Sequence, residues 1–450
     1  MAAKGKRILL DSSGNLYPAI ATQEFPQVYR ISIEMITRVD IERLRQAVME
    51  ILPKFPVFCQ SLGRGCFWHY LEKSEQLPLV RRMQEAGLEK FSENGLQFRF
   101  LCEGNWIHLE VFHALTDGTG AIHFLHACCY RYCQLVYCNL FSADSLEKRY
   151  GIEGAEDMQD AYQKFNATKG DFWKILKKKP AYRLASKRVP NGKRTVCSGQ
   201  IFLSELKEIS CKYHVTVCEF LTAVVLYILW QEHKDAAAME KRMIRLAIPV
   251  NLRKIFHQRT ERNFFTCISV EIDPEKNYTL ENMLAEVKKQ FSDKCTEENL
   301  RKQIEGQVSG QRNLLSRVSP VVLQDWFLRK VYQYNGYSTM VISNLGKIQP
   351  LKEFEPFILG YRCVLPVTKS EPEKIAICSY RDTLVFTVTS ILEEVTLQRK
   401  MVKEMERFGM AVKVQPEYTD YDNGKKEYGK CERYTERRYG RKGKYFICAS

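Results

Sequence analysis

The stretch Val111–Leu125, VFHALTDGTGAIHFL, places a histidine four residues before an aspartate that is followed by a glycine. An imidazole whose pKa lies near neutrality can take a proton from a hydroxyl or an amine, so His113 is a candidate general base. The carboxylate of Asp117 could orient the loop around that base, and Gly118 and Gly120 allow a sharp turn and a close approach of backbone. By itself, however, so short a motif favours an ordinary histidine at the end of a strand.

The residues around the motif predict a strand that ends at the histidine and a helix that begins after the glycines. Residues 106–113, WIHLEVFH, alternate as a strand does, and the apolar segment that starts after Gly120 is helical in its spacing to about Cys138. Elsewhere in the first part of the chain, strands are expected at 27–36, 66–71 and 96–102, and a helix at 41–52.

The second part of the chain repeats this mixture of strands and helices. Strands are expected at 196–203, 243–250, 264–272, 339–343, 374–380 and 383–390. Helices are expected at 204–213, 217–231, 280–295, 320–334 and 395–408. No internal repeat emerges, so the chain predicts α/β domains of individual sequence rather than a solenoid.

The length of 450 residues exceeds what one hydrophobic core usually serves, which predicts two domains. We expect the first domain at 1–150 and the second at 196–412, with a polar, charged and weakly periodic connection at 151–195. Residues 413–450 are rich in Tyr, Lys, Arg, Glu and Gly and nearly lack aliphatic side chains. Because such a composition cannot bury enough surface to offset the entropy of ordering, we expect a basic, Tyr-rich disordered tail.

The net charge of +15 raises nucleic acid as a partner, and the aromatic and basic tail could contact RNA. The basic residues are nevertheless scattered, and neither zinc-finger spacing nor an RNP-like motif accompanies them. An attraction for anionic small molecules, such as phosphate-bearing cofactors, explains the same charge. Nucleic acid is therefore the less favoured partner.

Cysteine usage and hydropathy bear on the location of the protein. Cys128, Cys129, Cys133 and Cys138 lie on a predicted helix without a C-x-x-C pair, which favours buried free thiols over a metal site. The apolar run of residues 8–10 is too short for a signal peptide. The longest apolar run, residues 220–230, falls well below the ~20 residues that span a bilayer. We expect a cytoplasmic protein without a membrane span.

Three further segments accompany the histidine motif, namely IPVNLRKIF (248–256), RNFFTCISV (262–270) and MVISNLGKI (340–348). Together with FHALTDGTG, and in this order, they resemble the chloramphenicol-acetyltransferase-like superfamily of CoA-dependent acyltransferases. The likeness is strongest to its alcohol acetyltransferase and condensation-domain-like branch. It covers roughly residues 10 to 412. The tail has no counterpart in it.

The resemblance implies an α/β fold, an α+β sandwich, of two domains with mixed sheets flanked by helices and with the active site at the domain interface. It also implies transfer of an acyl group from a CoA or carrier-protein thioester to an alcohol or amine. His113 would be the general base in a ternary complex. The thioester would be a substrate, with no tightly bound cofactor and no metal. An acyl carrier protein is then a candidate partner.

The resemblance also gives roles to four other residues. Asp117 and Gly118 would be structural, with Asp117 in an ion pair for which Arg253 is the preferred partner, although a surface arginine is an equal alternative. Ser343 and Asn344 are candidates for the tunnel wall or for stabilising an oxyanion. A turn-forming role for Asn344, before Leu-Gly, is at least as well favoured.

Two departures from the superfamily pattern leave a second function open. The pattern H-H-x-x-x-D-G has Phe112 in place of its first histidine, and the D-F-G-W-G motif of the plant branch is absent from the sequence. The base itself is retained at His113. The alternative hypothesis is a non-catalytic binding or scaffold protein on a degenerate acyltransferase fold. The sequence identifies neither the acyl length nor the acceptor.

Overall fold

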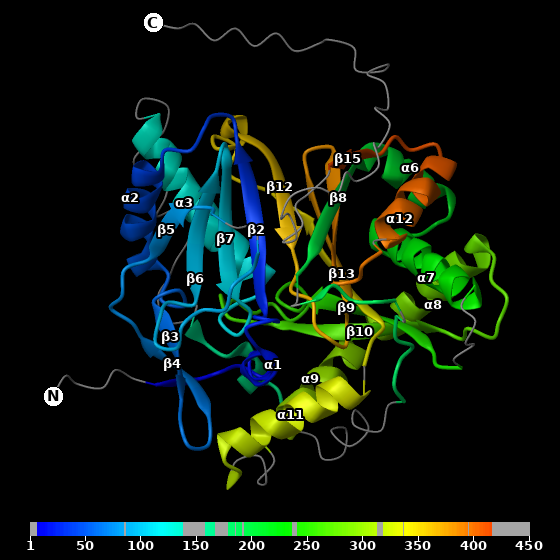
Figure 1. The fold of residues 1–450 in the computed structure, drawn as a ribbon, viewed down its shortest axis with the longest axis horizontal. Helices are drawn as coiled ribbons and strands as arrows, with labels where there is room; N and C mark the ends of the chain where they lie inside the picture. Colours follow the sequence, from blue (N-terminus) through cyan, green and yellow to red (C-terminus); the bar gives the residue numbers. More distant parts are fainter. Residues whose placement is uncertain are drawn as a thin grey trace, which may run out of the picture.

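The computed structural model shows two α/β halves that lie side by side, each built around its own sheet (Figure 1). The described residues are 7–84, 87–137, 158–166, 179–184, 186–190, 193–235, 241–312, 318–335, 337–394 and 396–415. Two large hydrophobic clusters correspond to the two halves. The mixed α/β fold class predicted from the sequence is confirmed.

The first half contains a five-stranded sheet with the order β12-β2-β7-β6-β5. Its strands are β2 (Val28–Met35), β5 (Leu79–Arg82), β6 (Phe98–Glu103), β7 (Trp106–Phe112) and β12 (Ile358–Val364). Helices α2 (Ile41–Ile51) and α3 (Gly118–Val136) pack against each other beside this sheet (Figure 1). A small sheet of β1 (Ile8–Leu9), β4 (His69–Lys73) and β3 (Gln60–Arg64) adjoins it.

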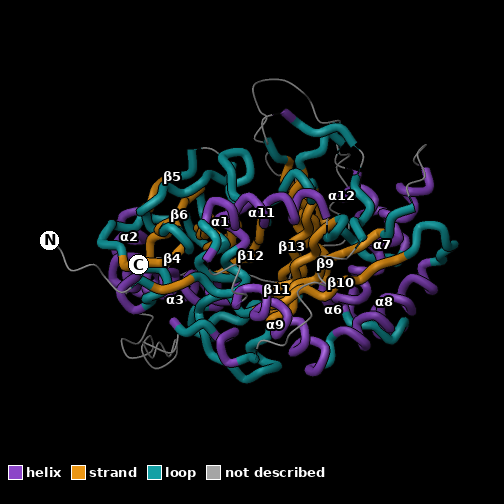
Figure 2. Tube along the Cα trace, turned by 90° about the horizontal axis from the view of Figure 1, so that it is seen from below, coloured by secondary structure: helices purple, strands orange, loops and turns teal. Residues whose placement is uncertain are grey.

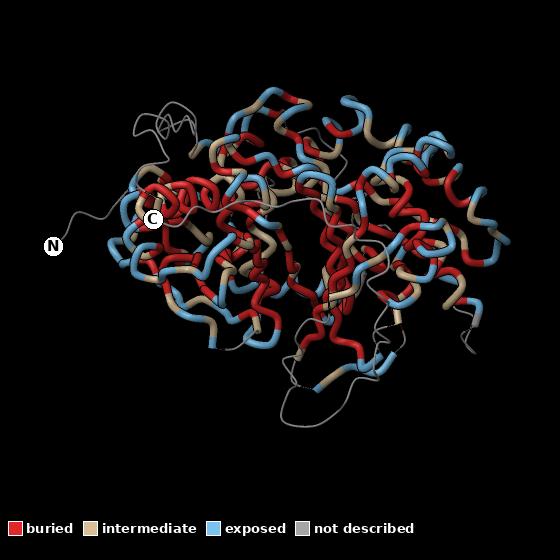
Figure 3. Tube along the Cα trace, turned by 90° about the horizontal axis from the view of Figure 1, so that it is seen from above, coloured by how far each residue is buried: buried red, intermediate tan, exposed pale blue. Residues whose placement is uncertain are grey.

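The second half contains a seven-stranded mixed sheet with the order β10-β9-β11-β13-β14-β8-β15. Its strands are β8 (Thr195–Phe202), β9 (Ile244–Asn251), β10 (Phe265–Ile272), β11 (Met340–Lys347), β13 (Glu373–Tyr380), β14 (Thr383–Ser390) and β15 (Lys413–Gln415). The helices are α6 (Leu203–Lys212), α7 (Val217–Asp235), α8 (Leu280–Lys294), α9 (Glu297–Arg312), α11 (Val321–Asn335) and α12 (Thr396–Arg407). The short α1 (Leu16–Ile20) packs on α11, and single 3-10 turns occupy η1 (Leu52–Lys54), η3 (Ala161–Lys164) and η5 (Glu355–Phe357). The chain is buried along the strands and exposed on the outer turns (Figure 3).

The two faces of the seven-stranded sheet differ in character. Because side chains alternate along a strand, Ile342 and Ile375 point into the second hydrophobic cluster, while their neighbours Ser343 and Lys374 point to the opposite face. The pairing register places Cys267 of β10 on that same face as well. One face of the second sheet is thus apolar and packs on its core helices, and the opposite face is more polar.

Strand β12 connects the two halves. It follows β11 in the chain, but it pairs antiparallel with β2 of the first sheet before the chain returns to the second sheet as β13. The sequence did not predict this strand, since its residues, ILGYRCV, contain a glycine and an arginine that break the apolar alternation. Residues 358–364 therefore lie in the sheet of the first half, although the expected domain at 196–412 includes them.

Two other segments differ from the expectations. Residues 413–415, assigned to the tail, form β15 and pair with β8, so the ordered edge extends to Gln415. The rest of the tail lies outside the described residues. Within the expected connection at 151–195, Tyr162 and Phe165 are buried in the second core instead of being solvated.

The sequence predicted no membrane span and favoured buried free thiols on the helix after the histidine motif. Among the described residues no single helix is both long and apolar enough to cross a bilayer; α6 and α7 together reach that length and composition, but a break bends them by 81°. Cys128, Cys129 and Cys133 are free and buried along α3. Cys138 lies outside the described residues.

A buried ion cluster stabilises the first sheet where β7 leads to the histidine motif. The pairing register places Arg30, Glu110 and Arg99 in one row across β2, β7 and β6. Glu110 is fully buried, and its two carboxylate oxygens accept hydrogen bonds from Arg30 Nε at 2.8 Å and from Arg99 Nε at 2.6 Å. Breaking a buried cluster leaves uncompensated charge, which costs far more than breaking a pair in water.

We expect Glu110→Ala to lower the free energy of unfolding by about 3–5 kcal/mol, because two buried guanidinium groups lose their carboxylate. Glu50→Ala is the matched control, since Glu50 pairs with Arg131 at a half-exposed site, where such pairs contribute only about 0–1 kcal/mol. Urea denaturation measures both. Equal losses in the two variants would contradict this assignment.

Candidate functional site

His113 lies immediately after β7, at the junction between the two halves. Its backbone N–H donates to the carbonyl of Gln27 at 3.1 Å, and its own carbonyl accepts from Asn263 Nδ2 at 3.1 Å. The first contact comes from the first half of the chain and the second from the loop before β10. The backbone of the candidate base is therefore fixed from both sides of the junction.

Aromatic side chains hold the imidazole ring. Tyr17 of α1 stacks on it with the ring centroids 4.2 Å apart, and Tyr29 of β2 meets it edge-on at 4.9 Å. Phe265, the first residue of β10, lies at 5.8 Å. Rings of the two halves thus enclose the imidazole and restrict its rotation.

This environment keeps the imidazole neutral. Burial lowers the pKa of His113 to about 4, while its own carbonyl oxygen and the carboxylate of Asp117 offset the shift only in part. Among the described residues, its buried Nδ1 has no well-formed hydrogen bond. At neutral pH the ring therefore carries one proton and has a free lone pair, which is the state that a general base requires.

Several side chains around His113 are accessible to water and yet enclosed by protein. Tyr17 and Tyr332 are partly exposed, but burial raises the pKa of each well above its usual value. Cys267 is exposed, yet burial raises its pKa to about 12. Solvent therefore reaches side chains of α1, β10 and α11 near His113, and the His113 side chain is itself partly exposed.

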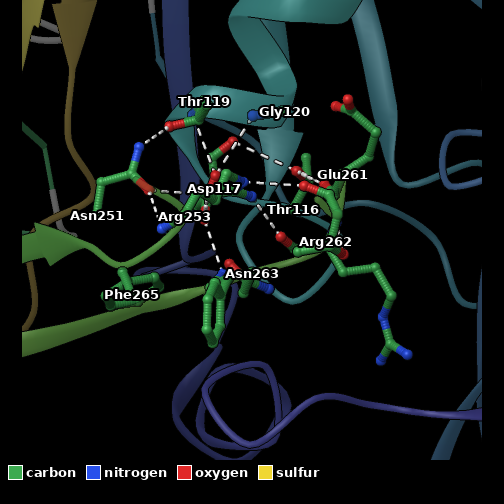
Figure 4. A network of polar contacts seen from close by, with 12 residues as sticks. Thr116, Asp117, Thr119, Gly120, Asn251, Arg253, Glu261, Arg262, Asn263 and Phe265 are labelled. Atoms are coloured by element: carbon green, nitrogen blue, oxygen red, sulfur yellow. Dashed lines mark hydrogen bonds and ion pairs between the residues drawn. The ribbon is translucent and has the colours of Figure 1, made fainter. Parts of the chain in front are cut away.

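Asp117 connects the two halves through a single carboxylate (Figure 4). Its Oδ1 caps α3 by accepting from the backbone N–H groups of Thr119 at 3.1 Å and Gly120 at 3.3 Å. Its Oδ2 accepts from Arg253 Nη1 at 2.8 Å and from the backbone N–H of Phe264 at 2.9 Å. The expected ion pair with Arg253 is present, and it joins a helix of the first half to two segments of the second.

Arg253 is held as firmly as its partner. Its Nε donates to the carbonyl of Thr260 at 2.9 Å, and its Nη2 donates to the carbonyl of Arg262 at 2.6 Å. Both side chains of the pair with Asp117 are close to fully buried, so the surface alternative does not describe this arginine. The planar guanidinium uses its fork of donors to fix the loop that follows β9.

Further polar contacts surround this pair at the same junction (Figure 4). Asn251 Nδ2 donates to Thr119 Oγ1 at 3.0 Å, and the hydroxyl of Thr116 donates to the carbonyl of Glu261. His123 Nδ1 lies 2.7 Å from a carboxylate oxygen of Glu261. These contacts attach the first turns of α3 to the loop between β9 and β10.

The two glycines of the motif lie close to residues of the second half. A Cβ atom on Gly118 would lie 2.5 Å from Cδ2 of Leu345, and one on Gly120 would lie 2.5 Å from the carbonyl oxygen of Glu261. Real Cβ atoms do not come so near to other heavy atoms. At Gly120 the obstacle is backbone, so glycine is required there, whereas at Gly118 the end of the flexible Leu345 side chain would have to move aside.

Ser343 and Asn344 of β11 point in opposite directions. Ser343 pairs with Ala376 on the more polar face of the second sheet, the face that also bears Cys267. Asn344 accepts at Oδ1 from the backbone N–H of Gly346 at 2.8 Å, which is the turn-forming alternative. Of the two candidates, Ser343 lies on the face that bears the solvent-exposed Cys267.

Sequence reasoning missed two residues that support the base. Asn263 Nδ2 bridges the carbonyl of His113 and, at 3.2 Å, Oδ2 of the fully buried Asp11. Burial raises the pKa of Asp11 to about 6, although the charge of Arg262 lowers it in part. The conspicuous segment RNFFTCISV contained Asn263, whereas Asp11 is separated from the motif by a hundred residues and gave no signal.

Phe112 and the histidines near His113 serve packing. Phe112, which replaces the first histidine of the superfamily pattern, is buried in the first hydrophobic cluster. His108 bonds to Ser32 at 2.8 Å, and His126 lies 2.9 Å from the hydroxyl of Tyr361. Over the part of the chain that the structure describes, no group of three His, Cys, Asp or Glu side chains is placed to bind a metal ion.

Comparison with solved structures identifies the fold. Fusarium graminearum TRI101 complexed with coenzyme A and T-2 mycotoxin aligns over 91% of this chain and 100% of its own, with a TM-score of 0.61 and 8% identity. The chain has the chloramphenicol-acetyltransferase-like fold. TRI3 trichothecene 15-O-acetyltransferase from Fusarium sporotrichioides aligns over 89% of this chain and 94% of its own, with a TM-score of 0.58 and 10% identity.

Condensation domains share the same chloramphenicol-acetyltransferase-like fold. The starter condensation domain of rhizomide synthetase RzmA aligns over 90% of this chain and 97% of its own, with a TM-score of 0.53 and 10% identity. No protein-family description matches the chain, and neither does any curated protein sequence. The predicted resemblance is thus confirmed for the fold, through structure and not through sequence identity.

The first prediction from this site concerns Asp117. We expect Asp117→Ala to lower the free energy of unfolding by about 3–5 kcal/mol, because a buried Arg253 loses its carboxylate. Asp117→Asn should lose less, since asparagine still caps a helix N-terminus. Chemical denaturation measures both losses. In a double-mutant cycle the loss in Asp117→Ala/Arg253→Ala should be smaller than the sum of the single losses, and simple additivity would contradict the pairing.

The second prediction concerns protonation of the histidine. A folded pKa of about 4 lies below the unfolded value of ~6.5, so the unfolded chain takes up this proton first as the pH falls. The stability contributed by neutral His113 should therefore be present above about pH 6.5 and be lost as the pH falls towards 4. Nitrogen chemical shifts of the ring, assigned with His113→Gln, should show a midpoint near pH 4. A midpoint near 6.5 would refute the enclosed environment.

Proposed function

We propose that the protein is an acyltransferase that moves an acyl group from a CoA or carrier-protein thioester to an alcohol or amine. The observation that carries this proposal is the position of the His113 imidazole, which Tyr17, Tyr29 and Phe265 hold at the junction of the two halves while solvent still reaches it. The likeness of fold to an acetyltransferase and to a CoA complex supports the same conclusion. The net charge of +15 suits a donor that bears phosphates.

The mechanism we propose needs no covalent enzyme intermediate. The acceptor O–H or N–H gives its proton to His113 while its oxygen or nitrogen attacks the thioester carbonyl carbon. The tetrahedral intermediate then collapses as the C–S bond breaks, and the imidazolium returns the proton to the departing sulfur. The products are an ester or amide and a free thiol, and the base ends as it began. Such proton transfer typically contributes ~10²–10⁴-fold to the rate.

The geometry of the site supports this role for His113. Because both backbone groups of His113 are bonded and its ring is stacked on Tyr17, little reorganisation is needed to present the lone pair. Asp117 lies in the junction and does not bond to the imidazole. We therefore propose that Asp117, Gly118 and Arg253 act on structure, by fixing the loop that follows the base.

Stabilisation of the oxyanion needs a preorganised donor near the thioester oxygen. Ser343 is the candidate we favour, because its strand position turns it toward the face that bears the solvent-exposed Cys267. Asn344 is the weaker candidate, since its side-chain oxygen is used in the turn with Gly346. The proposal of an acyl carrier protein as a partner follows only from the fold likeness to a condensation domain.

Release of free thiol from a panel of acyl-CoA donors, with alcohols and amines as acceptors, tests this function. We expect His113→Ala to lower turnover by about 10²–10⁴-fold, because only the general base is removed. His257→Asn is the matched control, as His257 is exposed and has a φ of 50°, which asparagine tolerates. Mass spectrometry of the products identifies the acyl group and the acceptor.

The same assay separates the proposal from the alternative of a non-catalytic scaffold. A scaffold would retain ligands beside His113 but would release no thiol with any donor. Turnover by His113→Ala equal to that of the wild type would sink the general-base assignment, provided that thermal unfolding shows both proteins to be folded.

A further inference from the structure

The outer face of α11 exposes an unusual group of large apolar side chains. Val322, Leu323, Trp326 and Phe327 are 58%, 59%, 59% and 44% exposed. Their spacing of one, three and four residues places them on one side of the first two turns of the helix. Isolated apolar residues are common on protein surfaces, but a contiguous group with a tryptophan and a phenylalanine marks an interaction site.

The exposure of this face does not come from a loosely held helix. On the inner side, Asp325 binds His69 of β4 at 3.0 Å, and the Tyr332 hydroxyl donates to Glu371 at 2.8 Å. Arg329 Nε donates to the carbonyl of Ala19 at 2.9 Å. Three polar contacts thus fix the inner side of α11 to both halves of the protein, and the apolar side chains are held outward.

Positive charge continues the outer face beyond the apolar turns. Lys330 follows Phe327 by three residues and Trp326 by four, so it lies on the same side of the helix. It lines a pocket of about 340 Å³ together with Pro180, Arg183, Arg242 and Gln333. The pocket therefore brings three cationic side chains next to the exposed aromatic residues.

We propose that this surface, formed by the outer face of α11 and the pocket with Arg183 and Arg242, docks the protein on an anionic lipid bilayer. The apolar side chains would enter the region between headgroups and acyl chains, and the cations would meet lipid phosphates. Apolar area and attraction to anionic lipid act together in such peripheral binding. The docking does not depend on the proposed acyl transfer.

The shape and charge of the surface favour a bilayer over a second copy of the chain. Helix α11 lies at the lower edge of the molecule in Figure 1, and in Figure 2 it lies beside α1. Its exposed apolar side chains therefore lie at an outer edge of the fold. In a symmetric dimer the same surface would face itself. The single acidic residue of α11, Asp325, is turned inward to His69, so the helix offers no outward carboxylate to pair with the cations of a partner.

Flotation of the full chain with lipid vesicles tests the proposal. We expect binding to phosphatidylcholine vesicles that contain phosphatidylserine, much weaker binding to phosphatidylcholine alone, and a decline with added salt. Trp326→Ser/Phe327→Ser should weaken partitioning at least about a hundredfold, because two large apolar side chains are lost. Lys330→Glu/Arg242→Glu should weaken it about tenfold or more, and only on the vesicles with anionic lipid.

Matched controls keep the test decisive. Leu77→Ser and Leu359→Ser remove apolar side chains that are 75% and 54% exposed at other places, and Lys212→Glu reverses an exposed charge on α6. These variants should bind as the wild type does. Thermal unfolding shows whether each variant is folded. Because the substituted positions are exposed, we expect no folding defects.

Three outcomes would overturn the proposal. The first is a folded wild type that does not float with anionic vesicles, or patch variants that float as well as it does. The second is self-association that disappears in Trp326→Ser/Phe327→Ser without vesicle binding, which would make the surface a contact between copies. The third is binding of inorganic phosphate to the pocket without vesicle binding, which would make the pocket a site for a soluble anion.

Discussion

The carboxylate of Asp117 is the constraint on which the rest of the site depends. One oxygen caps the N-terminus of α3, and the other accepts hydrogen bonds from a guanidinium and a backbone amide of the opposite half. A carboxylate in this position must be fully bonded, because an unsatisfied buried charge is among the costliest defects that a fold can contain. The requirement fixes the relative position of the two halves, and with it the surroundings of His113.

The environment of the base follows from that fixed junction. Tyr17 and Tyr29 come from the first fifty residues and Phe265 from the second half, so the ring is enclosed only when both halves are in place. The same packing reduces the hydration of the imidazole and keeps it neutral. The packing of the two halves around His113 therefore also lowers the proton affinity of its imidazole.

Local sequence predicted the parts of the fold and site that local physics determines. The strand before His113, the helix after Gly118 and the Asp117–Arg253 pair all followed from alternation, turn residues or the motif resemblance. Tyr17 and Asp11 could not be predicted, because they reach the site from far along the chain and no periodicity marks them. Likewise, β12 pairs with a strand more than three hundred residues earlier, and nothing in its sequence, ILGYRCV, indicates which strand it pairs with.

The crossing of β12 also has a consequence for how the protein can come apart. Separation of the halves would remove β12 from its place beside β2 and expose a row of unpaired backbone groups along β2, at a new sheet edge. Strand β12 would have to leave the five-stranded sheet, while β11 and β13, which precede and follow it in the chain, remain in the seven-stranded sheet. We therefore expect the two halves to unfold together, as one domain would, although the molecule contains two hydrophobic cores. A fragment cut at the chain midpoint would inherit an open edge and a tendency to aggregate.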